Sequence, residues 1–245
     1  MQFQFSYYLV PLVVSGGISA LLAVFVFFNR HKRTAPQILA ILVAATVWSV
    51  TEALILASVG LEWKLLWHNV RFFGSTLVVL AVFLHALEYT NREQWITRES
   101  VIALSAVLVV TNVLAWTELA FDHGLIRASY QLVQVESMTL IEFEFGPLFY
   151  VNAVYSYLLL FGAAGMYVAE FLRRSGTYRL QTGGLIIGTL VPWGMNGLYL
   201  LGYSVVDLTA FGFTVTGVVF VAQFYRRNRP SASGLDPEGE GRTPR

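Results

Sequence analysis

Seven long apolar stretches, separated by short polar segments, dominate this sequence of 245 residues. An α-helix needs about 17 to 25 apolar residues to cross the hydrocarbon core of a bilayer, and each stretch is long enough. Hydrophobic residues make up 56% of the chain and charged residues 13%, which leaves too few polar groups to cover a soluble globule. We therefore expect an all-α membrane protein, a seven-transmembrane helix bundle in a lipid bilayer, with spans at about 7–29, 36–60, 66–90, 100–120, 147–172, 181–203 and 208–226.

The basic residues between these stretches are distributed unevenly. Eleven follow the first, third, fifth and seventh stretches, whereas three, Lys64, Arg71 and Arg127, belong to the opposite side. Because cytoplasmic loops carry an excess of Lys and Arg, we expect the N-terminus outside and the C-terminus in the cytoplasm. No basic residue precedes Arg30, so the sequence lacks the basic start of a cleavable signal peptide. The prediction is a multi-pass protein of the cell membrane whose first span stays as an anchor.

The chain divides into a membrane domain, residues 1–226, and a C-terminal tail, residues 227–245. The tail is rich in Pro, Gly, Ser and charge, and we expect it to be a disordered cytoplasmic segment because it cannot bury enough apolar surface. In the outer loop, residues 121–146, the sequences YQLVQVE and TLIEFEF alternate polar and apolar residues, which predicts a short β-hairpin. This hairpin is either a lid over a ligand cavity or a structural cap.

Ionisable residues inside apolar stretches are costly unless they are paired, so they mark candidate functional sites. Glu52 lies about eight residues before the outer end of the second span, and Arg71 lies about five residues after the outer start of the third. Antiparallel neighbours therefore bring the two side chains to a similar depth. Two interpretations stay open: a purely structural ion pair, and the floor of an outward-facing pocket that also holds Trp48, Trp67 and His68.

The segment from residue 178 to residue 213 combines apolar residues with seven glycines, Pro192, Asn196 and Asp207. Glycines let helices approach closely, and Pro192 removes one backbone hydrogen bond and can act as a hinge. Asn196, one turn later, offers a polar side chain. We expect a flexible, polar outer half in the sixth and seventh spans.

Several function classes require residues that this sequence lacks. A retinal protein needs a lysine in its seventh span, and the lysines here are Lys32 and Lys64. The sequence has no cysteine, and His68 and His85 lie about 25 Å apart on one helix, so no metal site is expected. Phosphate-binding glycine loops and the HExxH and GxSxG motifs are also absent. We expect no catalytic residue, no cofactor and no nucleic-acid partner.

A succession of short motifs runs along the chain in addition to the Trp48 and Glu52 pair of the second span. They are WHNVRFFG (67–74), LEYT (87–90), WTELAFDHGLI (116–126), YSYLL (155–159), YRLQ (178–181), VPWGMNGLYLLG (191–202) and DLT (207–209). Over residues 7–226 this order resembles the N-terminal seven-span sensor region of many bacterial and archaeal histidine kinases. Two positions depart from that family's pattern: Asn152 stands where a histidine is expected, and Ala210 stands where a proline usually follows DLT.

The resemblance implies ligand binding in the outer half of the bundle. The candidate ligand-binding residues are Trp48, Glu52, Trp67, His68, Arg71, His123, Asn152, Tyr155, Asn196 and Asp207, with Pro192 as the hinge. Because His is replaced by Asn152, ligand chemistry that depends on that histidine is not expected here.

The favoured interpretation is a stand-alone membrane sensor without a catalytic domain of its own, which binds a ligand and signals to a separate cytoplasmic histidine kinase or response regulator. The first alternative is a small-solute transporter with a 3+1+3 arrangement, because spans 1 to 3 and 5 to 7 have matching orientations. A membrane-embedded assembly partner without a ligand is the second alternative. Formation of a homodimer is also left open.

Overall fold

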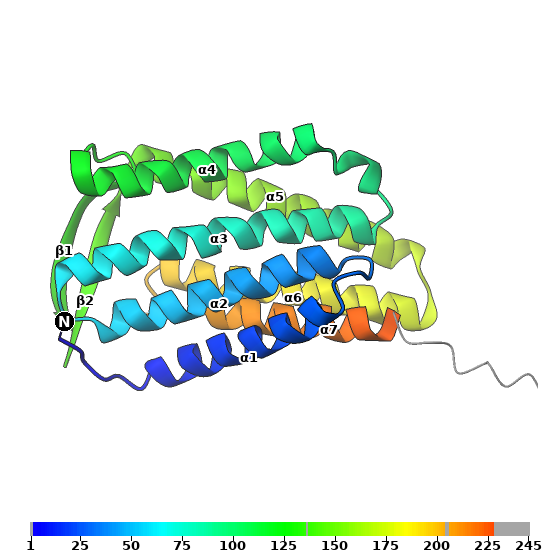
Figure 1. The fold of residues 1–245 in the computed structure, drawn as a ribbon, viewed down its shortest axis with the longest axis horizontal. Coiled ribbons are helices and arrows are strands. Elements are labelled where there is room, and N and C mark those ends of the chain that lie inside the picture. Colours follow the sequence, from blue (N-terminus) through cyan, green and yellow to red (C-terminus); the bar gives the residue numbers. More distant parts are fainter. Residues whose placement is uncertain (1, 136, 204–205, 228–245) are drawn as a thin grey trace, which may run out of the picture.

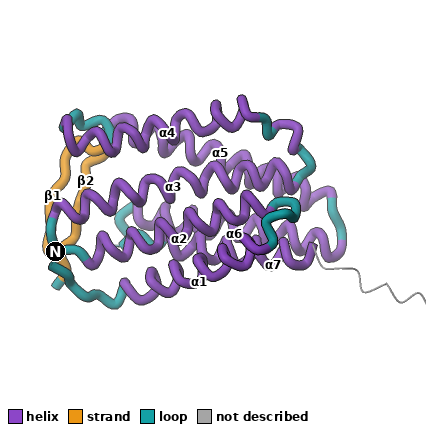
Figure 2. Tube along the Cα trace, in the orientation of Figure 1, coloured by secondary structure: helices purple, strands orange, loops and turns teal. Residues whose placement is uncertain are grey.

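The computed structural model describes residues 2–135, 137–203 and 206–227. Within these residues, seven α-helices run side by side along one long axis (Figure 1). A two-stranded antiparallel sheet crosses one end of the bundle (Figure 2). The predicted helical fold and the hairpin in the loop 121–146 are confirmed. The predicted tail, residues 227–245, lies outside the described residues except for Arg227, so its disorder and the division into two parts stay predictions.

Each predicted span corresponds to one helix of the structure. The largest differences are five residues, at the starts of α3 (61 against 66) and α6 (176 against 181). The elements are α1 (Leu9–Phe28), α2 (Ala35–Ala57), α3 (Leu61–Tyr89), the short 3₁₀ helix η1 (Glu93–Trp95), α4 (Arg98–Phe121), β1 (Arg127–Val135), β2 (Met138–Phe145), α5 (Pro147–Arg173), α6 (Gly176–Leu200) and α7 (Thr209–Arg227).

Local signals set several helix ends. Thr97 and Ser100 form a capping box at the start of α4, in which the Ser100 amide donates to Thr97 Oγ1 at 3.2 Å and the Thr97 amide donates to Ser100 Oγ at 3.0 Å. At the other end of α4, Asp122 has φ of 45°, a left-handed conformation that a right-handed helix cannot continue. Pro147 begins α5, where its missing N–H has no helical partner to lose.

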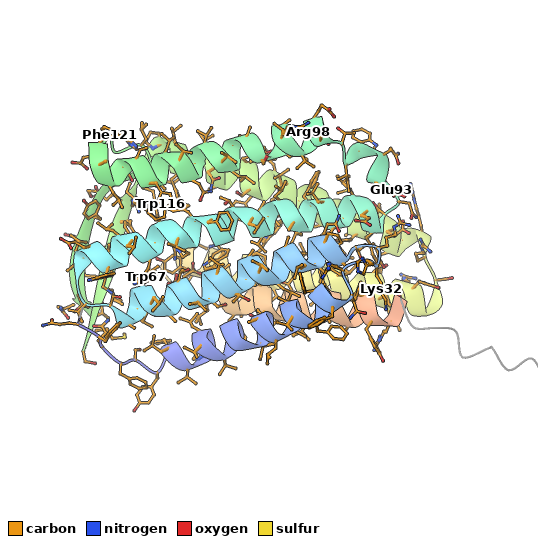
Figure 3. The ribbon with its side chains drawn as sticks, viewed as in Figure 1. Lys32, Trp67, Glu93, Arg98, Trp116 and Phe121 are labelled. Atoms are coloured by element: carbon orange, nitrogen blue, oxygen red, sulfur yellow. The ribbon has the colours of Figure 1, made fainter. Side chains whose placement is uncertain are left out.

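Among the described helices, the five from α1 to α5 are long and apolar enough to cross a membrane. That α6 and α7 also cross, and that the N-terminus lies outside, stay predictions. Lys32, Glu93 and Arg98 lie at one end of the bundle, which we call the basic end, and Trp67 and Phe121 lie toward the other (Figure 3). The second end carries the hairpin, and we call it the hairpin end.

Helices α2, α3 and α7 form the centre of the bundle. α2 packs against α1, α3 and α7, whereas α4 lies at the edge and contacts α3 and α5. α2 and α3 approach closely at Gly74, where an added Cβ atom would lie 3.0 Å from the Ala44 carbonyl oxygen. This central position lets α2, α3 and α7 bring side chains from distant parts of the sequence into one site.

Candidate functional site

The hairpin has a fixed position over the helix ends. The Gln4 side chain donates from Nε2 to the carbonyl oxygens of Leu56, at 2.7 Å, and Thr139, at 2.9 Å. Its Oε1 accepts from the Thr139 amide at 2.8 Å. The N-terminal segment thus joins the end of α2 to strand β2.

A buried arginine anchors the other side of the hairpin. Arg127, 2% exposed, donates from Nε to Glu118 Oε2 of α4 at 2.9 Å and from Nη1 to Asn69 Oδ1 of α3 at 2.8 Å. Its Nη2 donates to the Ala115 carbonyl oxygen at 2.9 Å. Burial lowers the pKa of the Arg127 guanidinium below its ordinary value, and the bond to the Glu118 carboxylate opposes this shift. The hairpin is therefore held by directed bonds to two helices.

The predicted pairing of Glu52 with Arg71 is present, and a third residue joins it. Arg71 Nη1 lies 2.7 Å from Glu52 Oε2 and 3.4 Å from Asp207 Oδ2, and both carboxylates are buried. Asp207 Oδ1 also accepts from the Thr209 amide at 2.9 Å. We call Glu52, Arg71 and Asp207 the ion triad. It connects α2, α3 and the segment before α7.

His68 connects the ion triad to the hairpin anchor. Its Nε2 lies 2.7 Å from Arg71 Nη2, and its Nδ1 lies 3.3 Å from Arg127 Nη1. A neutral imidazole has one acceptor nitrogen, so one of these two contacts is a full hydrogen bond at a time. The His68 ring also packs on Phe143 of β2, with ring centroids 4.2 Å apart. His68 therefore contacts both the hairpin and the ion triad.

Two cavities adjoin the ion triad. The first, which we call the bundle cavity, has a volume of about 130 Å³ and lies between α2, α3, α5, α6 and α7. The second, the hairpin cavity, has a volume of about 390 Å³ and lies between the hairpin and the ends of α2, α3 and α6. Both are lined by Arg71, Phe145, Tyr199 and Asp207.

Most of the candidate residues meet at these cavities. The bundle cavity is lined by Trp48, Arg71, Asn152, Pro192, Asn196 and Asp207, and the hairpin cavity by Glu52, His68, Arg71 and Asp207.

Three candidates lie outside both linings. The Tyr155 hydroxyl donates to the Leu104 carbonyl oxygen of α4 at 2.8 Å, so this side chain is used in packing α5 on α4. His123 Nδ1 lies 3.3 Å from Glu118 Oε1, beside the hairpin anchor. Trp67 is in the second turn of α3, with its Nε1 buried and without a hydrogen-bond partner in the described part of the chain.

Sequence reasoning missed Lys64, Trp193 and Tyr199, which also line the cavities. Trp193 follows the hinge proline directly, and Tyr199 lies three residues after Asn196 on the same helix face, so both could have been included. The predicted third span begins at residue 66, which leaves Lys64 in the polar segment before it. In the structure α3 begins at Leu61, so Lys64 lies in the first turn of the helix, where it is buried and its Nζ donates to the Ile55 carbonyl oxygen at 2.7 Å.

In the residues that the structure describes, no group of three or more His, Cys, Asp or Glu side chains is placed to hold a metal ion. The site consists of an ion triad, aromatic walls and neutral polar groups. Such a site can bind and orient a small molecule.

This chain matches a known protein family. The family described as the N-terminal 7TM region of histidine kinase matches residues 11–229, a range that includes both cavities. No curated protein matches the chain. The matched region is the sensor part of such kinases and not their catalytic domain, and it agrees with the apolar helices in identifying a membrane protein. The chain therefore belongs to the family of N-terminal seven-transmembrane regions of histidine kinases.

Proposed function

We propose that this protein is a membrane sensor module that binds a ligand in the bundle cavity and transmits a helix shift to the basic end. There a cytoplasmic histidine kinase or response regulator receives the signal. The proposal rests on one observation. Five helices line the cavity, and the ion triad beside the cavity connects α2, α3 and the segment before α7. A molecule bound there contacts the helices that would have to move.

The sixth helix supplies the most deformable wall. Pro192 lies inside α6 and lines the bundle cavity, and its missing N–H weakens the helix at that turn. A ligand moves α6 only if it binds one arrangement of the helices better than another. A contact with the wall at Pro192 or Trp193 meets that requirement, because it changes when α6 bends.

The seventh helix extends from the cavity to the basic end. Phe213 lines the bundle cavity, while Phe220 and Gln223 line another cavity, of about 240 Å³, near the basic end. Phe213 and Phe220 are seven residues apart and so lie on one face of α7, two turns from each other. Between them, the Thr216 hydroxyl donates to the Gly188 carbonyl oxygen of α6. A displacement of α7 beside the ligand would therefore be transmitted along α7 to the basic end, and α6 would move with it.

In this proposal the hairpin covers the hairpin cavity and does not move. It lines a cavity, as a lid does, but the Arg127 and Gln4 bonds favour a structural cap over a lid. We therefore assign the moving parts to α6 and α7. Family membership favours a sensor over the transporter alternative and over an assembly partner without a ligand.

The proposal can be tested without knowing the ligand. Ala153 lines the bundle cavity, so Ala153→Phe adds a ring where a ligand would lie, and Ala153→Leu adds a smaller group in case the ring prevents folding. Leu158→Phe is the control, because Leu158 is on the same helix but 64% exposed. A photo-reactive phenylalanine at Trp95, which is 65% exposed near the basic end, reports contacts with partners in intact cells.

A filled cavity is expected to change the amount of histidine kinase or response regulator cross-linked to position 95. The Leu158→Phe control is expected to leave that amount unchanged. If no such partner is cross-linked in any variant, or if all variants give the same amount, the proposed function is wrong.

A further inference from the structure

We infer that the bundle cavity binds a neutral molecule about the size of one aromatic ring that carries a hydrogen-bonding oxygen. This inference rests on the proposed function, since it names the chemical class of the ligand at the same site. Four properties of the cavity lead to it: its volume, its walls, its polar atoms and its charge balance.

The volume sets the size of the ligand. The cavity measures about 130 Å³. An engineered protein cavity of about 150 Å³ holds one benzene molecule, so the bundle cavity accommodates a single ring or a compact group of similar size. An acyl chain of ordinary lipid length or a sugar nucleotide would exceed it.

The walls favour a flat, apolar body. Trp48 packs on Phe213 with ring centroids 5.4 Å apart, and Phe145 stacks on Phe149 at 3.7 Å. All four side chains line the cavity. Aromatic rings prefer offset-stacked or edge-on neighbours, and a planar ligand can use both geometries against these walls.

Polar atoms of the lining require a partner. Trp48 Nε1, Trp193 Nε1, Asn152 Oδ1 and Thr209 Oγ1 are buried and have no hydrogen-bond partner among the described residues. All four residues line the cavity. An unsatisfied buried polar group is costly, and a ligand that pairs with it recovers that cost. When these side chains turn toward the cavity, the two indole N–H groups can donate to a ligand oxygen and Asn152 Oδ1 can accept from a ligand group.

The charged groups near the cavity already balance one another. Glu52 and Asp207 oppose Arg71 and Lys64, and Arg71 contacts both carboxylates. A charged ligand would therefore be buried without a counter-ion of its own, which is strongly unfavourable. This balance selects a neutral ligand over an ammonium or a carboxylate.

Four probes of nearly identical shape separate these cases. Benzamide is neutral, benzoate is its anionic counterpart and benzamidinium its cationic counterpart; α-methylstyrene keeps the shape without polar atoms. Binding would be measured by saturation-transfer NMR and calorimetry on the protein in nanodiscs, with protein-free nanodiscs as the control for partition into lipid. We expect benzamide to bind at least about tenfold more tightly than each of the other three.

Substitutions identify the site of binding. Trp193→Phe keeps an aromatic wall and removes one donor, and Asn152→Leu removes the acceptor. Each is expected to weaken benzamide severalfold while leaving α-methylstyrene unchanged. Trp116→Phe is the matched control, because Trp116 is 45% exposed on α4 and lies outside both cavity linings.

Tighter binding of either ion or of α-methylstyrene would overturn the inference, as would the absence of benzamide binding. These results are separable from a failure of the proposed function. The cross-linking comparison uses no added probe, so Ala153→Phe can change partner contacts even where benzamide does not bind.

Discussion

Gly212 in α7 lies against Pro192 in α6 so closely that a Cβ atom added to Gly212 would be 2.8 Å from Pro192 Cα. This separation is shorter than a normal contact between two carbon atoms, which is about 3.5 to 4.0 Å. Pro192 also lines the bundle cavity. The helices that we expect to move therefore touch through their backbones at the level of the ligand, and the contact requires a glycine.

Gly212→Ala is expected to push α6 and α7 apart and to lower the stability of the bundle by about 1 to 3 kcal/mol, the usual cost of overpacking. Thermal unfolding of the purified protein in detergent would show a lower midpoint. Gly194→Ala is the control, because an added Cβ at Gly194 meets nothing within 4 Å. Equal midpoints for the two variants would show that the close approach is not needed.

Arg71→Met is expected to be strongly destabilising, by about 3 to 5 kcal/mol, because it leaves two buried carboxylates without their shared cation. Arg174→Met offers a matched comparison. Arg174 pairs with Glu170 at 2.6 Å, but its side chain is 43% exposed, and an exposed pair contributes at most about 1 kcal/mol. Urea unfolding of both variants tests the difference. If Arg71→Met were as stable as Arg174→Met, the ion triad would not hold the bundle together.

Arg127→Lys is expected to loosen the hairpin while the helices stay folded. A lysine keeps the charge but cannot reach Glu118, Asn69 and the Ala115 carbonyl oxygen at once, as the guanidinium does. Hydrogen–deuterium exchange over residues 127–145 should become faster. Ser129→Ala, which removes an exposed bond to Glu144, should leave the exchange of the strands nearly unchanged. Unchanged exchange in Arg127→Lys would mean that other contacts hold the hairpin.

The number of spans can be counted with single cysteines, because the chain has none of its own. Seven spans predict that Tyr203→Cys, after α6, is labelled from outside intact cells together with Glu142→Cys in the hairpin. Ser175→Cys, before α6, should be protected. Tyr203 is 79% exposed, so access to the reagent is decided by the side of the membrane. Protection of both Ser175→Cys and Tyr203→Cys would show that α6 does not cross.

The helices and the hairpin could be predicted from the sequence because both depend on local patterns. A bilayer fixes the length of an apolar helix, and alternation of polar and apolar residues fixes a strand. The pairing of Glu52 with Arg71 could also be predicted, because depth along two consecutive antiparallel helices follows from counting residues.

The rest of the site depends on which helices are neighbours, and residue counting gives no such information. Asp207 reaches Arg71 because α7 packs against α2, a contact between segments far apart in sequence. The packing of α5 against α4 likewise decides that Tyr155 faces α4 instead of a cavity. The burial of Lys64 could not be predicted for a local reason, since polar residues in the first turn of α3 are typical of a loop.

The bundle cavity and the basic end are expected to move together. Spin labels on cysteines at Trp95 and Arg226, both exposed near the basic end, allow the distance between η1 and the end of α7 to be measured by double electron–electron resonance in nanodiscs. We predict a changed distance distribution in Ala153→Phe and an unchanged one in Leu158→Phe, relative to the labelled parent. Identical distributions in all three folded proteins would contradict the account.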